Sequence, residues 1–141
     1  MIIKVGIILS LFLVLIFLLL YKFYNNSDNI HKVYGKITKS DTEKIKGLMH
    51  RKDKLKYNEG MLFPMEYKHN SMWMKNTHIP LDVIFLDENM RILGYVVDTV
   101  PFSLKSISID KKSNNVLEMN GGSVDKFNKK IGDKIIFIEK N

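Results

Sequence analysis

The chain has 141 residues, which is room for one domain and little else. It contains no cysteine, so disulfides, thiolate metal sites and cysteine nucleophiles are excluded. The net charge is +7, but the lysines are scattered instead of being concentrated with interleaved aromatic residues, and this pattern argues against a nucleic-acid surface.

The first 24 residues are dominated by Ile, Leu, Val and Phe. No charged residue occurs from residue 5 to residue 21, and the surrounding apolar stretch reaches the roughly 20 residues that cross a bilayer as a helix. Tyr21 and Tyr24 follow, and such residues suit the headgroup level, whereas a cleavable signal peptide ends in small residues. The sequence therefore predicts a single-pass transmembrane signal anchor over residues 1–24.

Residues 25–30 are predicted to be a linker and residues 31–141 a β domain. More lysines follow the anchor than precede it, which favours a cytoplasmic domain by the positive-inside rule. Long downstream domains are, however, translocated largely regardless of their charge. We therefore expect the domain to lie on the extracytoplasmic side of the membrane.

A first strand is expected over residues 33–38, followed by a short helix. Ser40 or Asp41 can accept a hydrogen bond from an unpaired N–H of its first turn. Ile45, Leu48 and Met49 then follow at helical spacing, so we expect them to lie in the core. Further short strands are predicted over residues 60–65 and 72–74.

The stretch 81–86 is apolar on both faces of a strand. Leu81, Val83 and Phe85 would point one way, and Ile84 and Leu86 the other. Such a strand must be covered on both sides, so it is predicted to run through the middle of the domain. Residues 91–99 return as its hairpin partner, and the polar stretch 102–115 has room for one edge strand around residues 107 and 109.

The C-terminal part predicts two more strands, over residues 116–119 and 134–138, with a second short helix between them. Val124, Phe127 and Ile131 form the apolar stripe of this helix, and Gly132 suits the left-handed residue that closes it. Many short strands with turn residues between them, and two short helices, predict a mostly β domain, a compact β-sandwich or barrel.

Ordered motifs give the chain a resemblance to a known family. They are Trp73-Met74-Lys75-Asn76-Thr77, then Ile79-Pro80-Leu81-Asp82 and Phe85, with further matches at residues 47–49, 60–63, 116–118 and 132–133. In this order they resemble the domain-of-unknown-function family numbered 192, also called uncharacterised protein family 0127. The resemblance covers about residues 33–138. It implies a β-sandwich or barrel-like fold with two short helices, often behind an export signal or lipoprotein anchor, and it implies no activity.

Two departures from the family pattern bear on function. Where many relatives carry Cys and Pro, this chain has Phe102-Ser103-Leu104-Lys105, so a thiol role proposed there would not apply. Met72 replaces the aromatic residue that usually precedes the tryptophan. The resemblance therefore does not extend to a platform of two stacked aromatic rings.

The polar cluster around Pro80 is the candidate site. In the structural interpretation, Asn76 and Thr77 bond to their own backbone, and Asp82 accepts hydrogen bonds from N–H groups of the turn. In the chemical interpretation, Asp82 and Glu118 act as acid and base or as a clamp for a cationic ligand, while Lys75 holds an anionic group. Both interpretations remain open at the level of sequence.

The same region offers two further interpretations, metal binding and ligand stacking. His78 and Asp82 would share a metal only on a helix, which the intervening proline forbids, so no metal site and no cofactor is predicted. Trp73 and the neighbouring methionines could line a ligand groove, but core packing is the favoured interpretation. The methionines concerned are Met61, Met65, Met72 and Met74.

The leading hypothesis is a membrane-tethered binding module that acts at the extracytoplasmic membrane face on an envelope component or a protein partner. Its ligand-binding candidates are Trp73, Lys75, Asn76, Thr77 and Asp82. One alternative is a small enzyme with the acid–base pair named above. Another is an accessory subunit of a membrane complex. The sequence favours a protein without catalytic activity and predicts no nucleic-acid partner.

Overall fold

A computed structural model of the chain describes residues 2–25 and 29–140, with side chains in the first range only over residues 6–22. The elements, in chain order, are α1 (Ile2–Asn25), β1 (Ile30–Ile37), α2 (Asp41–Lys46), β2 (Glu59–Lys68), β3 (Leu81–Leu86), β4 (Ile92–Val96), β5 (Ser113–Asn120), α3 (Ser123–Lys126) and β6 (Lys134–Glu139). The prediction of a mostly β domain with short helices is confirmed.

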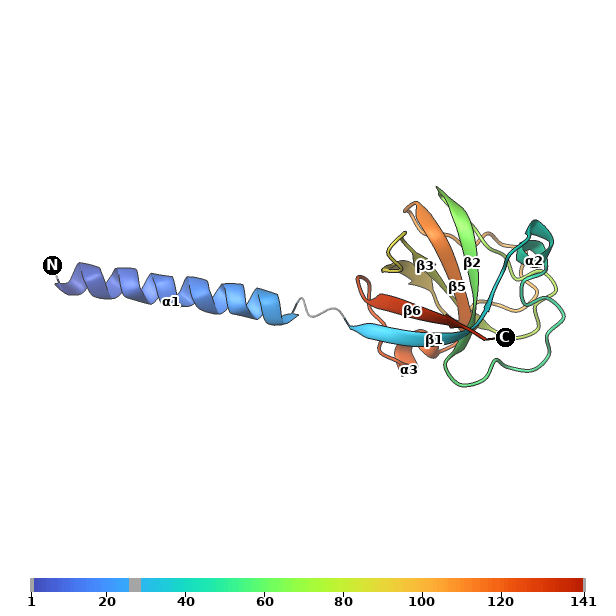
Figure 1. Cartoon of the computed structure of the whole chain (residues 1–141), viewed down its shortest axis with the longest axis horizontal. Coiled ribbons are helices and arrows are strands. Elements are labelled where there is room, and N and C mark those ends of the chain that lie inside the picture. The colour runs from blue at the N-terminus through green and yellow to red at the C-terminus, as the bar shows by residue number, and fades with distance from the viewer. Residues whose placement is uncertain (1, 26–28, 141) are drawn as a thin grey trace.

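Six strands form one curled sheet in the order β4-β3-β5-β2-β1-β6 (Figure 1). β1 runs parallel to both of its neighbours, β2 and β6, and the other pairs are antiparallel. At one end the two outer strands meet, because the Ile92 N–H donates to the Asp133 carbonyl (2.9 Å) and the Gly132 N–H to the Ile92 carbonyl (2.8 Å). The sheet therefore forms a half-barrel.

β3 lies in the sheet interior between β4 and β5, with every side chain buried, as its two-faced apolar pattern predicted. Leu81, Val83 and Phe85 belong to one core, which lies between the sheet and the long loops. Ile84 and Leu86 belong to a second core inside the curl of the sheet. Both faces of the central strands are thus covered, and burial of apolar surface on two sides stabilises the domain.

α2 differs from its prediction in what it buries. Ser40 is the N-cap, and its side chain accepts a hydrogen bond from the Glu43 N–H (3.2 Å). Leu48 is buried, but it follows the helix, and Ile45 is 67% exposed. The expectation that Ile45 lies in the core is wrong, because α2 lies on the surface and buries none of its side chains.

α3 is also shorter than predicted, with only four residues. Val124 is buried, whereas Ile131 lies beyond the helix and is 62% exposed, so its predicted place in the apolar stripe is wrong. Gly132 adopts a positive φ of 94°, as expected, but it precedes β6 and does not close the helix. The predicted strands at 72–74 and 107–109 reduce to one antiparallel bridge between Met72 and Ile107.

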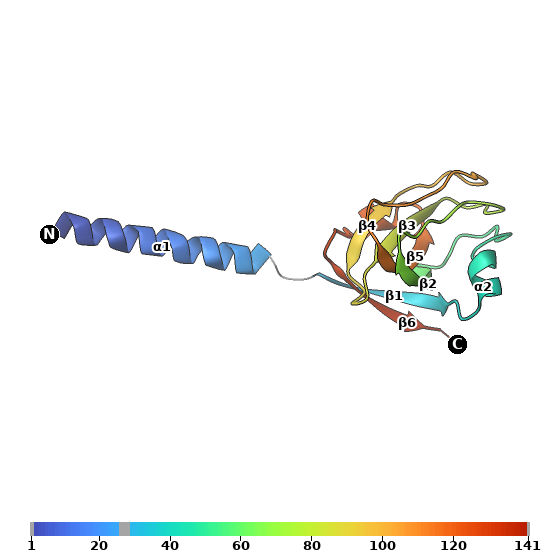
Figure 2. The same ribbon diagram turned by 90° about the horizontal axis from the view of Figure 1, so that it is seen from above.

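α1 is drawn as a separate rod beside the β domain in Figures 1 and 2. Its described large apolar side chains, from Ile7 to Leu20, are all exposed. Among the residues that the structure describes, no helix is both long enough and apolar enough to count as a membrane span. The transmembrane anchor predicted over residues 1–24 is therefore not supported. Residues 26–28 of the predicted linker lie outside the described residues.

Candidate functional site

The segment that carries the tryptophan motif is fixed by backbone hydrogen bonds to the long loop. Met72 and Ile107 exchange two N–H···O bonds of 2.9 Å each, and the Met74 N–H donates to the Ser103 carbonyl (3.0 Å). Side chains alternate along such an extended segment, so Met74 is fully buried while Trp73 is 45% exposed. The prediction of core packing is therefore confirmed for Met74 and wrong for Trp73.

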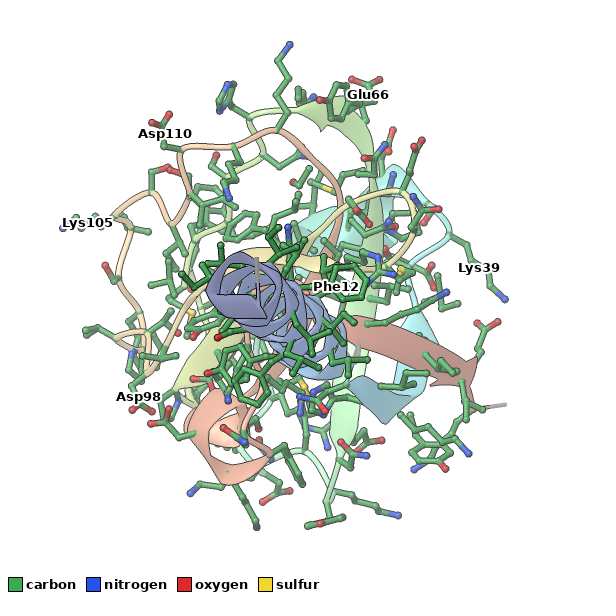
Figure 3. The ribbon with its side chains drawn as sticks, turned by 90° about the vertical axis from the view of Figure 1, so that its left-hand side faces the viewer. Phe12, Lys39, Glu66, Asp98, Lys105 and Asp110 are labelled. Atoms are coloured by element: carbon green, nitrogen blue, oxygen red, sulfur yellow. The ribbon has the colours of Figure 1, made fainter. Side chains whose placement is uncertain are left out.

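Trp73 lines a groove of about 320 Å³. Its neighbours come from α2, β2, the start of the tryptophan segment and the long loop, and they are Lys44, Ile45, Phe63, Met65, Ser71, Met72, Leu104 and Ser106. Ile45 and Leu104 are 67% and 68% exposed. Figure 3 shows the long loop, marked by Lys105 and Asp110, on the side of the domain opposite Lys39. The groove is thus an accessible surface with a mainly apolar lining.

A smaller cavity of about 30 Å³ adjoins the groove and shares Trp73, Phe63 and Met72 with it. Its lining also includes Glu118, which is only 4% exposed. The Oε2 atom of this residue is buried and has no hydrogen-bond partner among the described residues. Burial raises the pKa of the Glu118 carboxyl to about 8, so the group is mainly neutral at pH 7.

The sheet register explains why Glu118 lies there. β5 runs between β2 and β3, and Glu118 is paired with Met61 on one side and with Val83 on the other. Successive side chains of a strand point to opposite faces, so Glu118 shares a face with Val83, whose side chain belongs to the core beneath the long loops. The carboxyl group therefore enters an apolar layer next to the groove.

Asp82 points to the opposite face. It is paired with Met119, the residue after Glu118, and Met119 belongs to the core inside the curl. An acid and a base that act on one substrate must both reach it, which two carboxyls on opposite faces of a sheet cannot do. The predicted acid–base pair of Asp82 and Glu118 is therefore wrong, and so is the predicted clamp for a cationic ligand.

Asp82 instead ties three backbone segments together. Its Oδ1 accepts hydrogen bonds from the N–H groups of Asp98 (2.9 Å) and Gly122 (3.1 Å), and its Oδ2 accepts one from Val124 (2.7 Å). Two of these donors belong to the first turn of α3, whose N–H groups have no partner within the helix. The structural interpretation of Asp82 agrees with these contacts, although they do not involve the turn around Pro80.

The remaining candidates divide between the turn and the cavity. Thr77 is buried, its hydroxyl donates to the Lys75 carbonyl (3.2 Å), and it lines the small cavity. Asn76 has a left-handed φ of 53°, and its carbonyl accepts from the His50 N–H (2.8 Å). The Lys75 Nζ lies 5.1 Å from the centre of the Trp73 ring, and Lys75 lines the cavity. Lys75 and Thr77 thus accompany Glu118, whereas Asn76 and Asp82 do not.

Sequence reasoning missed the contribution of α2. Lys44 and Ile45 line both the groove and the cavity, and Lys46 lines the cavity. The sequence feature that could have indicated this contribution is the density of lysines after residue 43. Such a density of charge is, however, usual for a solvated surface. Among the described residues, no group of three or more His, Asp or Glu side chains could hold a metal ion.

A second buried ionisable side chain lies on the other face of the sheet. Lys129 is 3% exposed, and its Nζ, which has no hydrogen-bond partner among the described residues, lies 4.2 Å from the centre of the Phe127 ring. Burial lowers the pKa of the Lys129 ammonium to about 8, while the carboxylates of Asp82 and Asp133 act in the opposite direction. This group borders α3 and takes no part in the groove.

Comparisons with known proteins give a family and two similar structures. The model of the DUF192 family, described as an uncharacterized ACR, matches residues 23–137. A protein of unknown function from Novosphingobium aromaticivorans DSM 12444 is 32% identical, with a TM-score of 0.64, and the match covers 74% of this chain and 71% of that one. A "putative transcription regulator" from Sinorhizobium meliloti 1021 is 30% identical, with a TM-score of 0.65, and the match covers 74% and 78%. No curated protein matches the chain.

Proposed function

This chain belongs to the uncharacterized DUF192 family, and we propose that it is a binding module for a small molecule with an apolar body, which lies in the groove beside Trp73. The volume of about 320 Å³ is at the lower end of the range for small-molecule sites. The lining also suits a small molecule, because small-molecule sites combine an apolar wall with a few polar groups. A protein partner would need a much larger contact surface.

The observation that carries the proposal is the buried carboxyl of Glu118, whose Oε2 has no partner within the described chain. A buried polar group without a hydrogen bond costs about 1–3 kcal/mol. A ligand whose head group enters the cavity would supply the missing partner and remove this cost. Glu118 lines the same cavity as an exposed tryptophan and does not lie elsewhere in the core. This position favours a binding role.

The same geometry disfavours the enzyme alternative. Glu118 is the carboxyl that lines the cavity, and Asp82 is held on the other face by three N–H groups. General acid–base catalysis of the predicted kind needs a second group within reach of the substrate. Binding needs only the groove and one polar contact. The accessory-subunit alternative stays a prediction from the sequence.

Attachment to a membrane is the second part of the proposal. The exposed apolar side chains of α1 support it, because so large an apolar surface is rarely left in water and a bilayer would cover it. A helix can insert into a bilayer through its apolar surface without crossing the bilayer completely. α2 lies at the end of the sheet away from the start of β1 (Figure 1), so the groove would face away from the lipid. We propose that the groove lies on the extracytoplasmic side of the membrane and that its ligand is an envelope component.

The groove is tested with the fluorescence of Trp73, which is the single tryptophan of the chain. The full chain in non-ionic detergent micelles is titrated with 3-phenylpropanol, an uncharged aromatic probe. We expect a saturable change that Ile45→Asp abolishes, because a carboxylate would then border the apolar groove. Ile131→Asp is the matched control, since Ile131 is similarly exposed (62%) and lies outside the groove. Equal titration curves for the two variants and the wild type would refute the proposed site.

Membrane attachment is tested separately by extracting cell membranes at alkaline pH. The full chain should remain in the membrane pellet, and a chain without residues 2–25 should be released. Attachment through α1 is wrong if both chains are recovered in the supernatant. The two experiments are independent, so either part of the proposal can fail alone.

A further inference from the structure

We propose that the groove binds an amphipathic carboxylate, and that Glu118 donates a hydrogen bond to the oxyanion head group while neighbouring lysines supply positive charge. This inference rests on the proposed function and adds the chemical class of the ligand. It assigns the head group to the small cavity and the apolar body to the groove. The sizes agree, because about 30 Å³ holds one small polar group and about 320 Å³ holds the larger part.

The charges that line the cavity point to an anion. Lys44 and Lys46 come from α2, and Lys75 comes from the turn after Trp73. Apart from Glu118, these are the charged residues of the cavity lining, and the residues paired with Glu118 on the flanking strands, Met61 and Val83, are uncharged. The Lys44 Nζ also lies 4.0 Å from the exposed Asp41 carboxylate, so the positive charge of the lining comes mainly from Lys46 and Lys75. This charge attracts an anionic head group and repels an amine.

An anion in this cavity needs a hydrogen-bond donor, and the neutral carboxyl of Glu118 supplies one. No ion pair within the described chain involves its carboxyl group, so the lysines do not hold it in the ionised form. A neutral carboxyl offers one O–H donor, whereas a carboxylate only accepts and would repel the ligand. The raised pKa of about 8 keeps the donor in place at neutral pH. A hydrogen bond to a charged acceptor is also stronger than one between neutral groups.

The other ligand classes fit the cavity less well. A cationic head group could pair with an ionised Glu118, but Lys46 and Lys75, which line the same cavity, would repel it. An alcohol or amide could bond to the neutral carboxyl, but it would gain nothing from the positive charge of Lys46 and Lys75. A carboxylate satisfies both features at once. The indole of Trp73 then contributes contact area to the apolar body, as aromatic side chains do at binding sites.

Three probes with one apolar body test the assignment: 3-phenylpropanoate, 3-phenylpropanol and 3-phenylpropylamine. Each is titrated into the full chain in non-ionic micelles and into the Ile45→Asp variant, and only the signal that this variant abolishes is counted as groove binding. At pH 7 we expect the carboxylate to bind at least about tenfold more tightly than the alcohol, and the amine most weakly. Lys75→Met should weaken binding of the carboxylate and leave that of the alcohol unchanged.

Two substitutions of Glu118 identify its role. Glu118→Met removes the donor and should reduce the preference for the carboxylate to the share that the lysines supply. Glu118→Gln keeps an N–H donor that does not ionise, so the loss of carboxylate binding expected for the wild type between pH 7 and 9 should be absent. Circular dichroism checks that both variants fold. The inference is overturned if the wild type binds alcohol as tightly as carboxylate, while the proposed groove would stand. If none of the three probes binds, the proposed function itself fails.

Discussion

Replacing Glu118 by Gln should change how the stability of the domain depends on pH. Burial raises the pKa of this carboxyl from an ordinary value of 4.5 to about 8 in the folded chain. The folded state therefore holds this proton more tightly than the unfolded state does. The resulting contribution to the free energy of unfolding is complete below pH 4.5 and is lost as the pH rises towards 8. At about 1.4 kcal/mol per pH unit, the loss over this interval approaches 5 kcal/mol. That is a large part of the 5–15 kcal/mol typical of a domain.

Urea unfolding of the full chain in non-ionic micelles, followed by Trp73 fluorescence, measures this effect at each pH from 5 to 8. Glutamine does not titrate, so the variant should become more stable relative to the wild type by about 1.4 kcal/mol for each pH unit. Groups common to both chains cancel in the difference. Glu66→Gln is the control, because the Glu66 side chain is 85% exposed and should give a flat difference. A flat difference for Glu118→Gln as well would refute the burial argument.

Three further substitutions probe the rest of the fold. Asp82→Asn should lower the free energy of unfolding in urea by about 2–4 kcal/mol, because one carboxylate accepts three N–H groups, while probe binding in the groove persists. Gly35→Ala should prevent folding, as judged by circular dichroism, because a Cβ there would lie 1.8 Å from the Gly60 carbonyl oxygen. Lys129→Met should remove a rise in stability between pH 8 and 10.5, since the folded wild type gives up the Lys129 proton earlier than the unfolded chain, and urea titrations across that range measure it.

Most of the fold could be predicted from the sequence because local patterns determine where strands lie. The two-faced apolar run of β3 required cover on both sides, and the structure supplies two cores. The helices were less predictable, because an apolar residue at helical spacing is buried only if something packs on it. Ile45 fits the spacing but lies on a helix that buries no side chain, and Ile131 lies beyond the end of α3, so both residues are exposed.

The site was less predictable than the fold because it depends on contacts between distant parts of the chain. A strand's alternation can be read from its sequence, but the partner and register of each strand cannot. Asp82 and Glu118 lie on adjacent strands, and a difference of one residue in register places them on opposite faces. The contribution of Lys44 and Ile45 depends on the crossover from β1 to β2, which brings α2 to the groove.

The pairing of the first strand with the last one has a consequence for aggregation. β6 pairs with β1 from Ile30 to Gly35, so one whole flank of β1 depends on β6 for its neighbour. A chain without β6 would expose that flank and invite pairing with another molecule. The pairing of β6 with β1 therefore protects an otherwise open strand edge from aggregation.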